Sequence, residues 1–402
     1  MPQIIIVGAG PTGATLALLL VKRGITVSLI EASTDFHRVF RGEGLMPSGL
    51  DALKQMGLSE ILEQIPHRSF DAWEVILGKK TLFRVAEPME PNSPPCTLVS
   101  QPPLLTALIE QAQTYPEFEF IQGFPVKDLL RVDDRVAGVK LSDGREIFAD
   151  LVIGADGRNS VIRQRAGLHL EKQPKDIDIL WFKLADSPKF IENTFYAVSN
   201  GDKSFGLFHG AEEGKLHLSW ILFPDKSQYE IDQKPAQWAP IFASVAPSWM
   251  AEHIVKSADT IERPIKLSVV VGRCPSWYAP GVMLLGDAAH PMSPIRAQGI
   301  NVALRDVIVT VNHLVPLLQA KATGAEIDAA LANIQAERTP EIIRAQQLQS
   351  EEADQAEILR KYAFIRPILF FGARLLRKKI RHNWVERQHE MRVGVTQVSL
   401  IV

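Results

Sequence analysis

Three glycines near the N-terminus have the spacing of a dinucleotide-binding turn. They lie in GAGPTG, residues 8–13, between the apolar run QIIIV and the apolar stretch ATLALLLVKRG. Glycine allows a tight turn and a close backbone approach to a pyrophosphate, and the N-terminus of the following helix presents N–H groups to that anion. A carboxylate ends the next apolar run, ITVSLIE, where an adenosine ribose would donate hydrogen bonds to it. The pattern predicts a site for FAD or NAD(P) and leaves the choice between them open. The expected contacts are Gly8, Gly10, Pro11, Thr12, Gly13 and Glu31.

Two other apolar runs end in an aspartate. DLVIGADG ends in Asp156 and Gly157, and GVMLLGD ends in Gly286 and Asp287. An ionised carboxylate at the end of a buried run needs hydrogen-bond donors, so Asp287 is expected to hold a ligand. The first segment, taken alone, fits an ordinary strand-to-helix turn followed by a solvated basic face.

Residues so far apart in the chain require elements that bring them together. The first 31 residues fit strand, glycine turn, helix and strand, which is a βαβ unit. Residues 47–65 fit a helical stretch, Gly78-Lys79-Lys80 fits a hairpin turn, strand signals dominate residues 174–272, and the pattern after Asn301 is almost entirely helical. The expected fold class is α/β, with a Rossmann-like nucleotide-binding domain interleaved with a β-sheet-rich substrate domain. The expected boundaries are 1–67, 100–173 and 273–345 for the first domain, 68–99 and 174–272 for the second, and 346–402 for a helical C-terminal segment.

Composition narrows the function classes. The 402 residues carry 44 Lys and Arg against 46 Asp and Glu, a formal net charge of −2, which argues against a broad nucleic-acid surface. Cys96 and Cys274 are the only cysteines, so we expect neither a disulfide framework nor a metal site. A reducing, cytoplasmic location is the simplest interpretation. A strand expected from Gln3 leaves no room for a cleavable leader.

In this order and at these separations, the three motifs resemble the single-component, group A FAD-dependent aromatic monooxygenases, the family of para-hydroxybenzoate hydroxylase. The resemblance spans GAGPTG, DGRNS and GDAAHP. It implies non-covalently bound FAD, NADH or NADPH as a transient co-substrate, and molecular oxygen. The implied reaction hydroxylates an aromatic or related cyclic small molecule through a flavin C4a-hydroperoxide. A flavin dehydrogenase or reductase that does not use oxygen, and a non-catalytic flavin-bound redox or ligand-binding protein, remain alternatives on the same fold.

The resemblance also implies roles for individual residues near the cofactor. Glu31 matches the ribose ligand, and Arg41 matches an arginine that approaches the cofactor and the nicotinamide site. Gln101 matches a polar side chain beside the ribityl or phosphate region. Asp156 and Gly157 match a motif that serves both FAD and NAD(P)H.

Around the third motif, Asp287 after Gly286 matches the aspartate that holds a ribityl hydroxyl. Pro294 matches a proline whose carbonyl lies near the reacting ring. The helix that begins near Gly299 and includes Asn301 is expected to point its positive end at the flavin.

One residue departs from the family pattern. Relatives usually have Pro-x-Gly-x-x-Gly-x-Asn, and here Arg296 replaces the first glycine. Its guanidinium either points to solvent or lines the pocket, where it would pair with an anionic substrate or add positive charge beside the flavin. The two interpretations stay open.

Substrate contacts are less well specified than cofactor contacts. Large or polar candidates on the expected strands are Trp181, His209, His217 and Trp220. For each of them, core packing or solvent exposure is the more common role. The alternation of KLHLSWIL puts His217 and Ser219 on one face and Trp220 on the other, without showing which face meets the pocket.

The segment FIRPILFFGARLLRKKIRHNW, residues 364–384, is apolar at helical spacing and carries six Arg or Lys without an acidic residue. Such a helix either contacts an anionic membrane surface peripherally or docks on the protein body with its cations extended outward; we favour docking. Monomer and homodimer are both compatible with the sequence.

Overall fold

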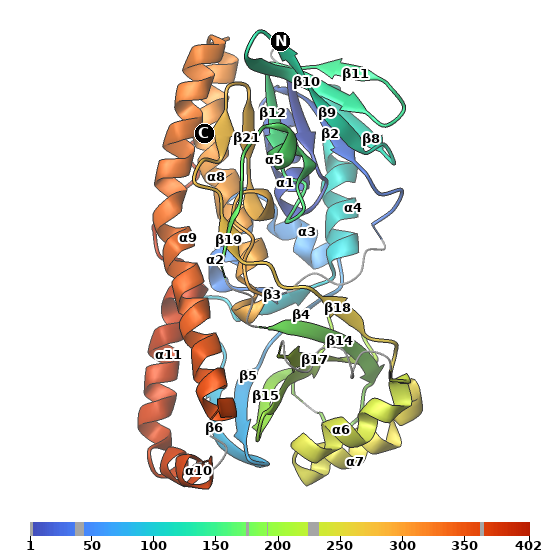
Figure 1. The fold of residues 1–402 in the computed structure, drawn as a ribbon, viewed down its shortest axis with the longest axis vertical. Coiled ribbons are helices and arrows are strands. Elements are labelled where there is room, and N and C mark those ends of the chain that lie inside the picture. The colour runs from blue at the N-terminus through green and yellow to red at the C-terminus, as the bar shows by residue number, and fades with distance from the viewer. Residues whose placement is uncertain (1–2, 37–43, 174–176, 191, 224–232, 362–365) are drawn as a thin grey trace.

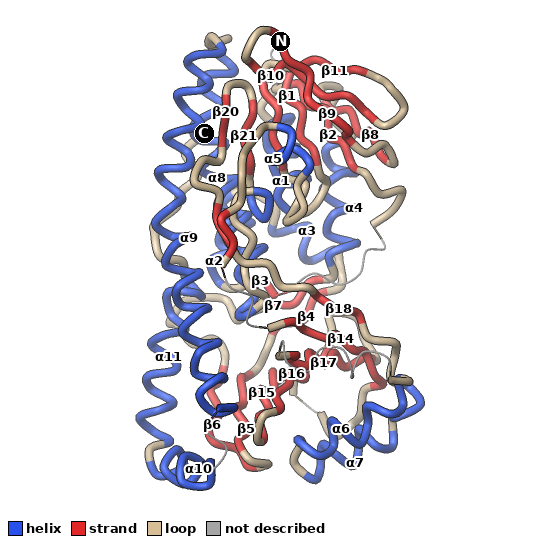
Figure 2. Tube along the Cα trace, viewed as in Figure 1, coloured by secondary structure: helices blue, strands red, loops and turns tan. Residues whose placement is uncertain are grey.

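The structure, a computed structural model, describes residues 3–36, 44–173, 177–190, 192–223, 233–361 and 366–402 (Figure 1). A six-stranded sheet and a seven-stranded sheet lie at opposite ends of an elongated molecule, and one long helix runs beside both (Figure 2). The architecture is mixed α/β with a helical C-terminal region, as expected.

The six-stranded sheet has the order β20-β21-β12-β1-β2-β8, with all pairs parallel except β20 and β21. Its inner strands are almost wholly buried, which explains why they are continuous apolar runs rather than alternating ones. The bounds are β1 Gln3–Val7, β2 Thr26–Glu31, β8 Phe118–Gln122, β12 Leu151–Gly154, β20 Tyr278–Ala279 and β21 Val282–Leu284.

Helices cover this sheet, and a small antiparallel sheet extends it. The helix α8 packs against α1, α2 and α9, and α1 packs against α4. The bounds are α1 Pro11–Val21, α2 Pro47–Gln55, α3 Ser59–Gln64, α4 Gln101–Ala112, α5 Val161–Arg165 and α8 Gln298–Gln319. The small sheet comprises β9 Val126–Val132, β10 Arg135–Leu141 and β11 Glu146–Phe148. The single helical stretch expected over 47–65 is wrong in one respect, because Gly57 adopts a φ of +69° and divides it into α2 and α3.

The seven-stranded sheet has the order β18-β14-β17-β16-β15-β5-β6. The hairpin expected at Gly78-Lys79-Lys80 is confirmed: it joins β5 and β6, and both Gly78 and Lys79 have positive φ. The bounds are β5 Ala72–Leu77, β6 Lys80–Ala86, β14 Asp178–Ala185, β15 Thr194–Asn200, β16 Lys203–His209, β17 Lys215–Leu222 and β18 Ile265–Leu267.

Strands dominate residues 174–272 as expected, and two helices in the same region cover one face of this sheet. They are α6 Trp238–Val245 and α7 Ser248–Lys256. Trp238 and Phe242 of α6 are fully buried against Trp220 and Leu218 of β17. An apolar sheet face must be covered, and these short helices cover it.

Short strands join the two large sheets, and helices complete the C-terminal region. The short strands are β3 Gly44–Leu45, β4 His67–Ser69, β7 Thr97–Val99, β13 Glu171–Lys172 and β19 Gly272–Arg273. The helices α9 Gly324–Lys361, α10 Arg366–Leu375 and α11 Arg377–Val393 follow α8. In Figure 1, α9 runs along most of the length of the molecule and α11 returns beside it. Within the described residues one helical segment, Ile295–Gln319, is long and apolar enough to cross a membrane, but 78% of its apolar 18-residue stretch is buried, as in the core helix of a fold.

Candidate active site

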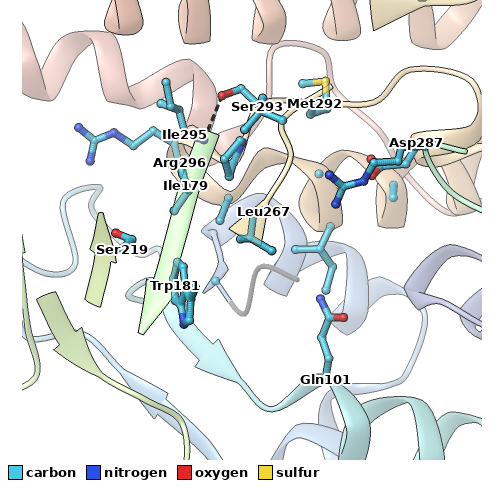
Figure 3. A pocket seen from close by; sticks show the side chains of 18 of the residues that line it. Gln101, Ile179, Trp181, Ser219, Leu267, Asp287, Met292, Ser293, Ile295 and Arg296 are labelled. Carbon is cyan, nitrogen blue, oxygen red and sulfur yellow. Dashed lines mark hydrogen bonds between the residues drawn. The ribbon is translucent and has the colours of Figure 1, made fainter. Parts of the chain in front are cut away.

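A cavity of about 530 Å³ lies between the two large sheets. Residues of all three sequence motifs line it, together with side chains from the seven-stranded sheet. In Figure 3, Gln101 and Asp287 lie on one side of the cavity, and Ser219 and Arg296 lie on the other. Segments more than 250 residues apart in the chain thus meet at one site.

The glycines of the first motif have two different roles. A Cβ on Gly8 would lie 2.4 Å from the Ala155 carbonyl oxygen, and one on Gly13 would lie 1.9 Å from the Gly8 oxygen. These two glycines therefore let the turn pack against β12 and α1. A Cβ on Gly10 would meet nothing within 4 Å, so the chain faces open space there, at the N-terminus of α1. That opening fits a pyrophosphate. Gly8, Gly10, Pro11 and Thr12 line the cavity, and Gly13 does not.

Glu31 lies at the end of β2, buried, and lines the cavity. The backbone N–H groups of Ala9 and Ser33 donate to its two oxygens at 2.9 Å and 2.8 Å. These bonds fix the carboxylate beside the glycine turn, where an adenosine ribose is expected. Arg41 lies outside the described residues.

The Asp156 carboxylate is engaged in holding a helix. Ser160 Oγ donates to it at 2.5 Å, and the N–H groups of Val161 and Ile162 donate at 2.7 Å and 3.1 Å. Burial raises the pKa of this carboxyl, and the hydrogen bonds from α5 oppose that rise. Asp156 and Gly157 both line the cavity. Because the Asp156 carboxylate already accepts hydrogen bonds from the start of α5, a cofactor would contact the other atoms of this motif.

Asp287 lies in a single 3₁₀ turn after β21 and lines the cavity. The preceding Gly286 has a φ of +56°, and a Cβ there would lie 2.7 Å from Thr12 Oγ1, so glycine lets the third motif approach the first. A Cβ on Gly299 would lie 3.7 Å from Asp287 Oδ1, which places the start of α8 beside the carboxylate. Gln101, the first residue of α4, lines the same part of the cavity.

The loop before α8 is held in an uncommon conformation. Arg296 and Ala297 both have positive φ, 59° and 50°, which non-glycine residues seldom adopt. The Pro294 carbonyl accepts a hydrogen bond from the N–H of Ala297 at 3.1 Å, and Pro294 lines the cavity. The side chain of Asn301 does not line it; its Oδ1 accepts from the N–H of Met46 at 2.8 Å and its Nδ2 donates to the carbonyl of Gly44 at 3.0 Å. Asn301 Nδ2 also donates to the carbonyl of Ala297 at 2.7 Å, so this side chain fixes the loop and does not reach the cavity, where we expected a cofactor contact.

Arg296 lines the cavity, and the solvent interpretation of this residue is wrong. Its Nε lies 3.0 Å and 3.1 Å from the two carboxylate oxygens of Glu352 on α9. Its guanidinium lies over the rings of Trp73 and Trp384, at 5.4 Å and 4.8 Å from their centroids. The positive charge is thus neutralised by Glu352, and does not stand open to a ligand.

Sequence reasoning missed the residues of α9 and α11 that support the loop around Arg296. Gln349 Nε2 donates to the carbonyls of Ser293 and Ile295 at 2.8 Å and 2.7 Å, and its Oε1 accepts from the Ser293 N–H at 3.2 Å. Gln349 and Glu352 are three residues apart, so they share one face of α9. That i, i+3 spacing is visible in the sequence, but nothing in it shows which loop the pair would contact.

Aromatic side chains form the far wall of the cavity. Trp181, Phe70, Trp73, Phe195 and Phe208 line it and contact one another with centroid separations of 4.9–6.0 Å. Of the four substrate candidates, Trp181 alone lines the cavity as the structure describes it.

The other three candidates lie behind the wall, which corrects the expected substrate contacts. Trp220 points to the opposite face of β17 and packs on Trp238 and Phe242, at 6.0 Å and 5.4 Å. His209 Nε2 lies 3.1 Å from Asp186, and burial lowers the pKa of this histidine. His217 packs edge-on against Trp181 at 5.8 Å, and burial lowers its pKa to about 3. Ser219 and Ile221 are the residues of β17 that reach the cavity.

No group of three His, Cys, Asp or Glu side chains that could hold a metal ion occurs in the part of the chain that the structure describes. Cys96 lines the cavity, and burial raises the pKa of its thiol to about 12, so the thiol is protonated at neutral pH.

Comparison with known proteins assigns the chain to a family. Residues 1–347 match the sequence model described as the FAD binding domain. The 6-methylpretetramide 4-monooxygenase of Streptomyces rimosus is 31% identical over 359 residues, which covers 86% of this chain and 82% of the relative. The 3-demethoxyubiquinol 3-hydroxylase of Escherichia coli K12 is 27% identical over 329 residues, covering 78% and 79%.

Solved structures share the fold. PqsL of Pseudomonas aeruginosa, crystallised with 2-aminobenzoylacetate, superposes with a TM-score of 0.79 at 21% identity, covering 90% of this chain and 99% of that one. The cavity also fits FAD, because the open space at Gly10, the Glu31 carboxylate and the Asp287 carboxylate all belong to the lining of one cavity. The chain therefore belongs to the FAD-dependent aromatic monooxygenase family, and it is an oxidoreductase with the para-hydroxybenzoate hydroxylase-like fold.

Proposed function

We propose that this enzyme hydroxylates a neutral, multi-ring aromatic substrate, with NADH or NADPH and molecular oxygen as co-substrates. One observation carries the choice of substrate: among the described residues, the two charged side chains beside the aromatic wall, Arg296 and Glu352, neutralise each other. A substrate carboxylate in an apolar cavity needs a cation of its own. The other charged side chains among the described lining residues belong to the three cofactor motifs; they are Glu31, Asp156, Arg158 and Asp287.

FAD, when bound, supplies the oxygen-transfer chemistry of such a reaction. The residues of this chain would hold and orient it. The turn around Gly10 and the N-terminus of α1 suit the pyrophosphate, Glu31 suits the adenosine ribose, and Asp287 with Gln101 suits the polyol chain. The N-terminus of α8, at Gly299, suits negative charge on the ring system.

The substrate would lie between the Pro294 loop and the aromatic wall. Rings such as those of Trp181 and Phe208 pack against planar substrates and exclude water from the reacting atoms. The hydroxyl of Ser219 reaches the cavity from β17, and those of Ser199 and Ser204, 2.9 Å apart, reach it from β15 and β16. Hydroxyl groups can hydrogen-bond phenol or carbonyl groups of a neutral ligand without requiring its charge.

A substrate of this kind partitions into lipid, and we propose that the enzyme acts in the cytoplasm with peripheral membrane contact through residues 364–384. The first compound to test is 6-methylpretetramide, for which the Streptomyces rimosus relative is named.

The test is NADH or NADPH oxidation by the purified holoenzyme, under air and under argon. Added compounds would be 6-methylpretetramide, neutral three- and four-ring phenols, and the monocyclic anion 3-hydroxybenzoate. The proposal expects neutral multi-ring compounds to accelerate nicotinamide oxidation and to be hydroxylated only under air. Acceleration and hydroxylation confined to the anionic single ring would contradict it.

A further inference from the structure

The helix α10 carries apolar side chains on both of its long faces. Phe370 and Ala373 face the protein and pack on the core cluster that contains Trp73 and Trp384. Ile368, Phe371 and Leu375 lie on the other side and are 71%, 64% and 70% exposed. Their spacing of three and four residues makes a stripe along the helix. Docking on the protein body, which we favour from the sequence for this segment, therefore accounts for only one of the two faces.

The exposed stripe lies at one end of the molecule, opposite the end formed by β10 and β11 (Figure 1). The tip of the β5–β6 hairpin lies beside it: a Cβ on Gly78 would be 2.9 Å from the ring of Phe370, so glycine at this turn lets α10 rest on the hairpin. Leu376, which is 57% exposed, extends the apolar stripe to the start of α11.

Cations surround this stripe. Residues 366–385 contain no Asp or Glu, in a chain whose formal net charge is −2. The exposed basic side chains around the stripe are Lys79, Lys80, Arg374, Arg377, Lys378, Lys379 and Arg381. The positive charge is therefore concentrated where the apolar side chains are exposed.

We propose that α10, the start of α11 and the β5–β6 hairpin tip form a docking surface for an anionic lipid bilayer. Exposed apolar side chains that enter the acyl boundary, flanked by Lys and Arg that contact anionic headgroups, are the two components of interfacial binding. A second copy of this chain fits the surface less well. A symmetric dimer would place these cations against their own copies, and like charges across an interface repel. This docking surface rests on the membrane contact proposed above and specifies its residues and its lipid. Vesicle binding is measured without any substrate, so a failure of this proposal is distinguishable from a failure of the proposed substrate class.

The experiment is flotation of the full-length holoenzyme with vesicles of phosphatidylcholine alone and with about 30% phosphatidylglycerol. Two variants separate the components: Ile368→Ser, Phe371→Ser and Leu375→Ser together, and Lys378→Glu with Lys379→Glu. A matched control is Val132→Ser with Phe148→Ser, two apolar side chains that are each 56% exposed on the distant small sheet. Flavin content and circular dichroism verify that each variant is folded.

We expect the wild type and the control to float with phosphatidylglycerol vesicles, and to release as salt is raised. Both variants should bind at least about tenfold more weakly. Absence of binding to anionic vesicles at low salt would overturn the proposal, as would unchanged binding by the apolar variant. A wild-type dimer that the apolar variant converts to a monomer in gel filtration would also overturn it, because a second copy would then cover the surface.

Discussion

Nε of Arg296 lies 3.0 Å and 3.1 Å from the two carboxylate oxygens of Glu352, which joins the loop before α8 to the C-terminal part of α9. The loop needs such support, because Arg296 and Ala297 both have left-handed backbone angles that cost non-glycine residues about 1–2 kcal/mol each. The rings of Trp73 and Trp384, whose centroids lie 6.3 Å apart, both lie within reach of the guanidinium and attract its charge. The ion pair therefore holds an otherwise unfavourable loop against the cavity.

Replacement of Arg296 should weaken substrate handling while FAD binding is retained. Arg296→Gly relieves the backbone strain and removes the ion pair, so the loop loses its connection to α9. We expect weaker substrate binding and more hydrogen peroxide per nicotinamide oxidised. FAD affinity, flavin reduction and hydroxylation would be measured separately. Glu352→Gln, which removes the same pair from its other side, should produce the same uncoupling. Wild-type values for Arg296→Gly in all three measurements would contradict this account.

Gln349 should contribute more to stability and to coupled hydroxylation than Gln347, which is exposed on the same helix. Gln349→Leu preserves side-chain volume and leaves two carbonyls and one N–H of the Ser293–Ile295 segment without their partner. Loss of hydrogen bonds to buried groups is expected to lower the free energy of unfolding by about 1–3 kcal/mol and to uncouple hydroxylation. Gln347→Leu is the control, because Gln347 is exposed on the same helix. Equal unfolding midpoints in urea and equal coupling for the two variants would show that Gln349 does not position the loop.

The two motif aspartates should have different roles, Asp287 in binding FAD and Asp156 in holding the start of α5. Asp287→Ala removes a charge-assisted acceptor beside the cofactor path and should weaken FAD binding by about 1.5–3 kcal/mol. Asp156→Ala removes the acceptor for the N–H groups of Val161 and Ile162 at the start of α5 and should lower the free energy of unfolding by about 1 kcal/mol, with a smaller effect on FAD. Titration of each apoprotein with FAD, followed by flavin fluorescence, distinguishes the two. An unchanged titration for Asp287→Ala would remove Asp287 from the site.

Burial of His217 predicts a specific loss of stability in acid. Its pKa is lowered from 6.5 to about 3 in the folded protein, so between these values the unfolded chain binds a proton that the folded protein does not. Stability from this group is therefore present above pH 6.5 and is lost as pH falls toward 3. The loss approaches about 1.4 kcal/mol per pH unit. In urea unfolding between pH 7 and 4, His217→Phe should show a shallower decline than the wild type. Parallel declines would mean that His217 is protonated in the folded protein.

The cofactor half of the cavity could be predicted from local sequence. The turn at residues 8–13, Glu31 at a strand end and Asp287 at another strand end each carry their signal within a few residues, because close backbone approach demands glycine there. The substrate half could not be predicted in the same way. Its wall depends on which face of β17 is inward, and that is decided by α6, whose apolar residues Trp238 and Phe242 cover Trp220 on the other face.

The α9 and α11 contacts lay beyond sequence reasoning for a related reason. Glu352 is 56 residues from Arg296, and Trp384 is farther still along the chain. Helical periodicity indicates that these residues lie on helices, but it does not indicate which loop the helices contact. The same limit applies to α10, where the sequence shows apolar and basic residues and only the packing shows that one apolar stripe stays exposed.

The most direct test of the central claim is isotope incorporation from labelled oxygen. The holoenzyme would be incubated with NADH or NADPH, ¹⁸O₂, and either a neutral multi-ring phenol such as 6-methylpretetramide or the anion 3-hydroxybenzoate. The masses of the products would be determined by mass spectrometry. We predict one ¹⁸O atom in the hydroxylated multi-ring product, formed in step with nicotinamide oxidation. Label in hydroxylated 3-hydroxybenzoate alone, or a multi-ring product whose new oxygen comes from water, would contradict the account.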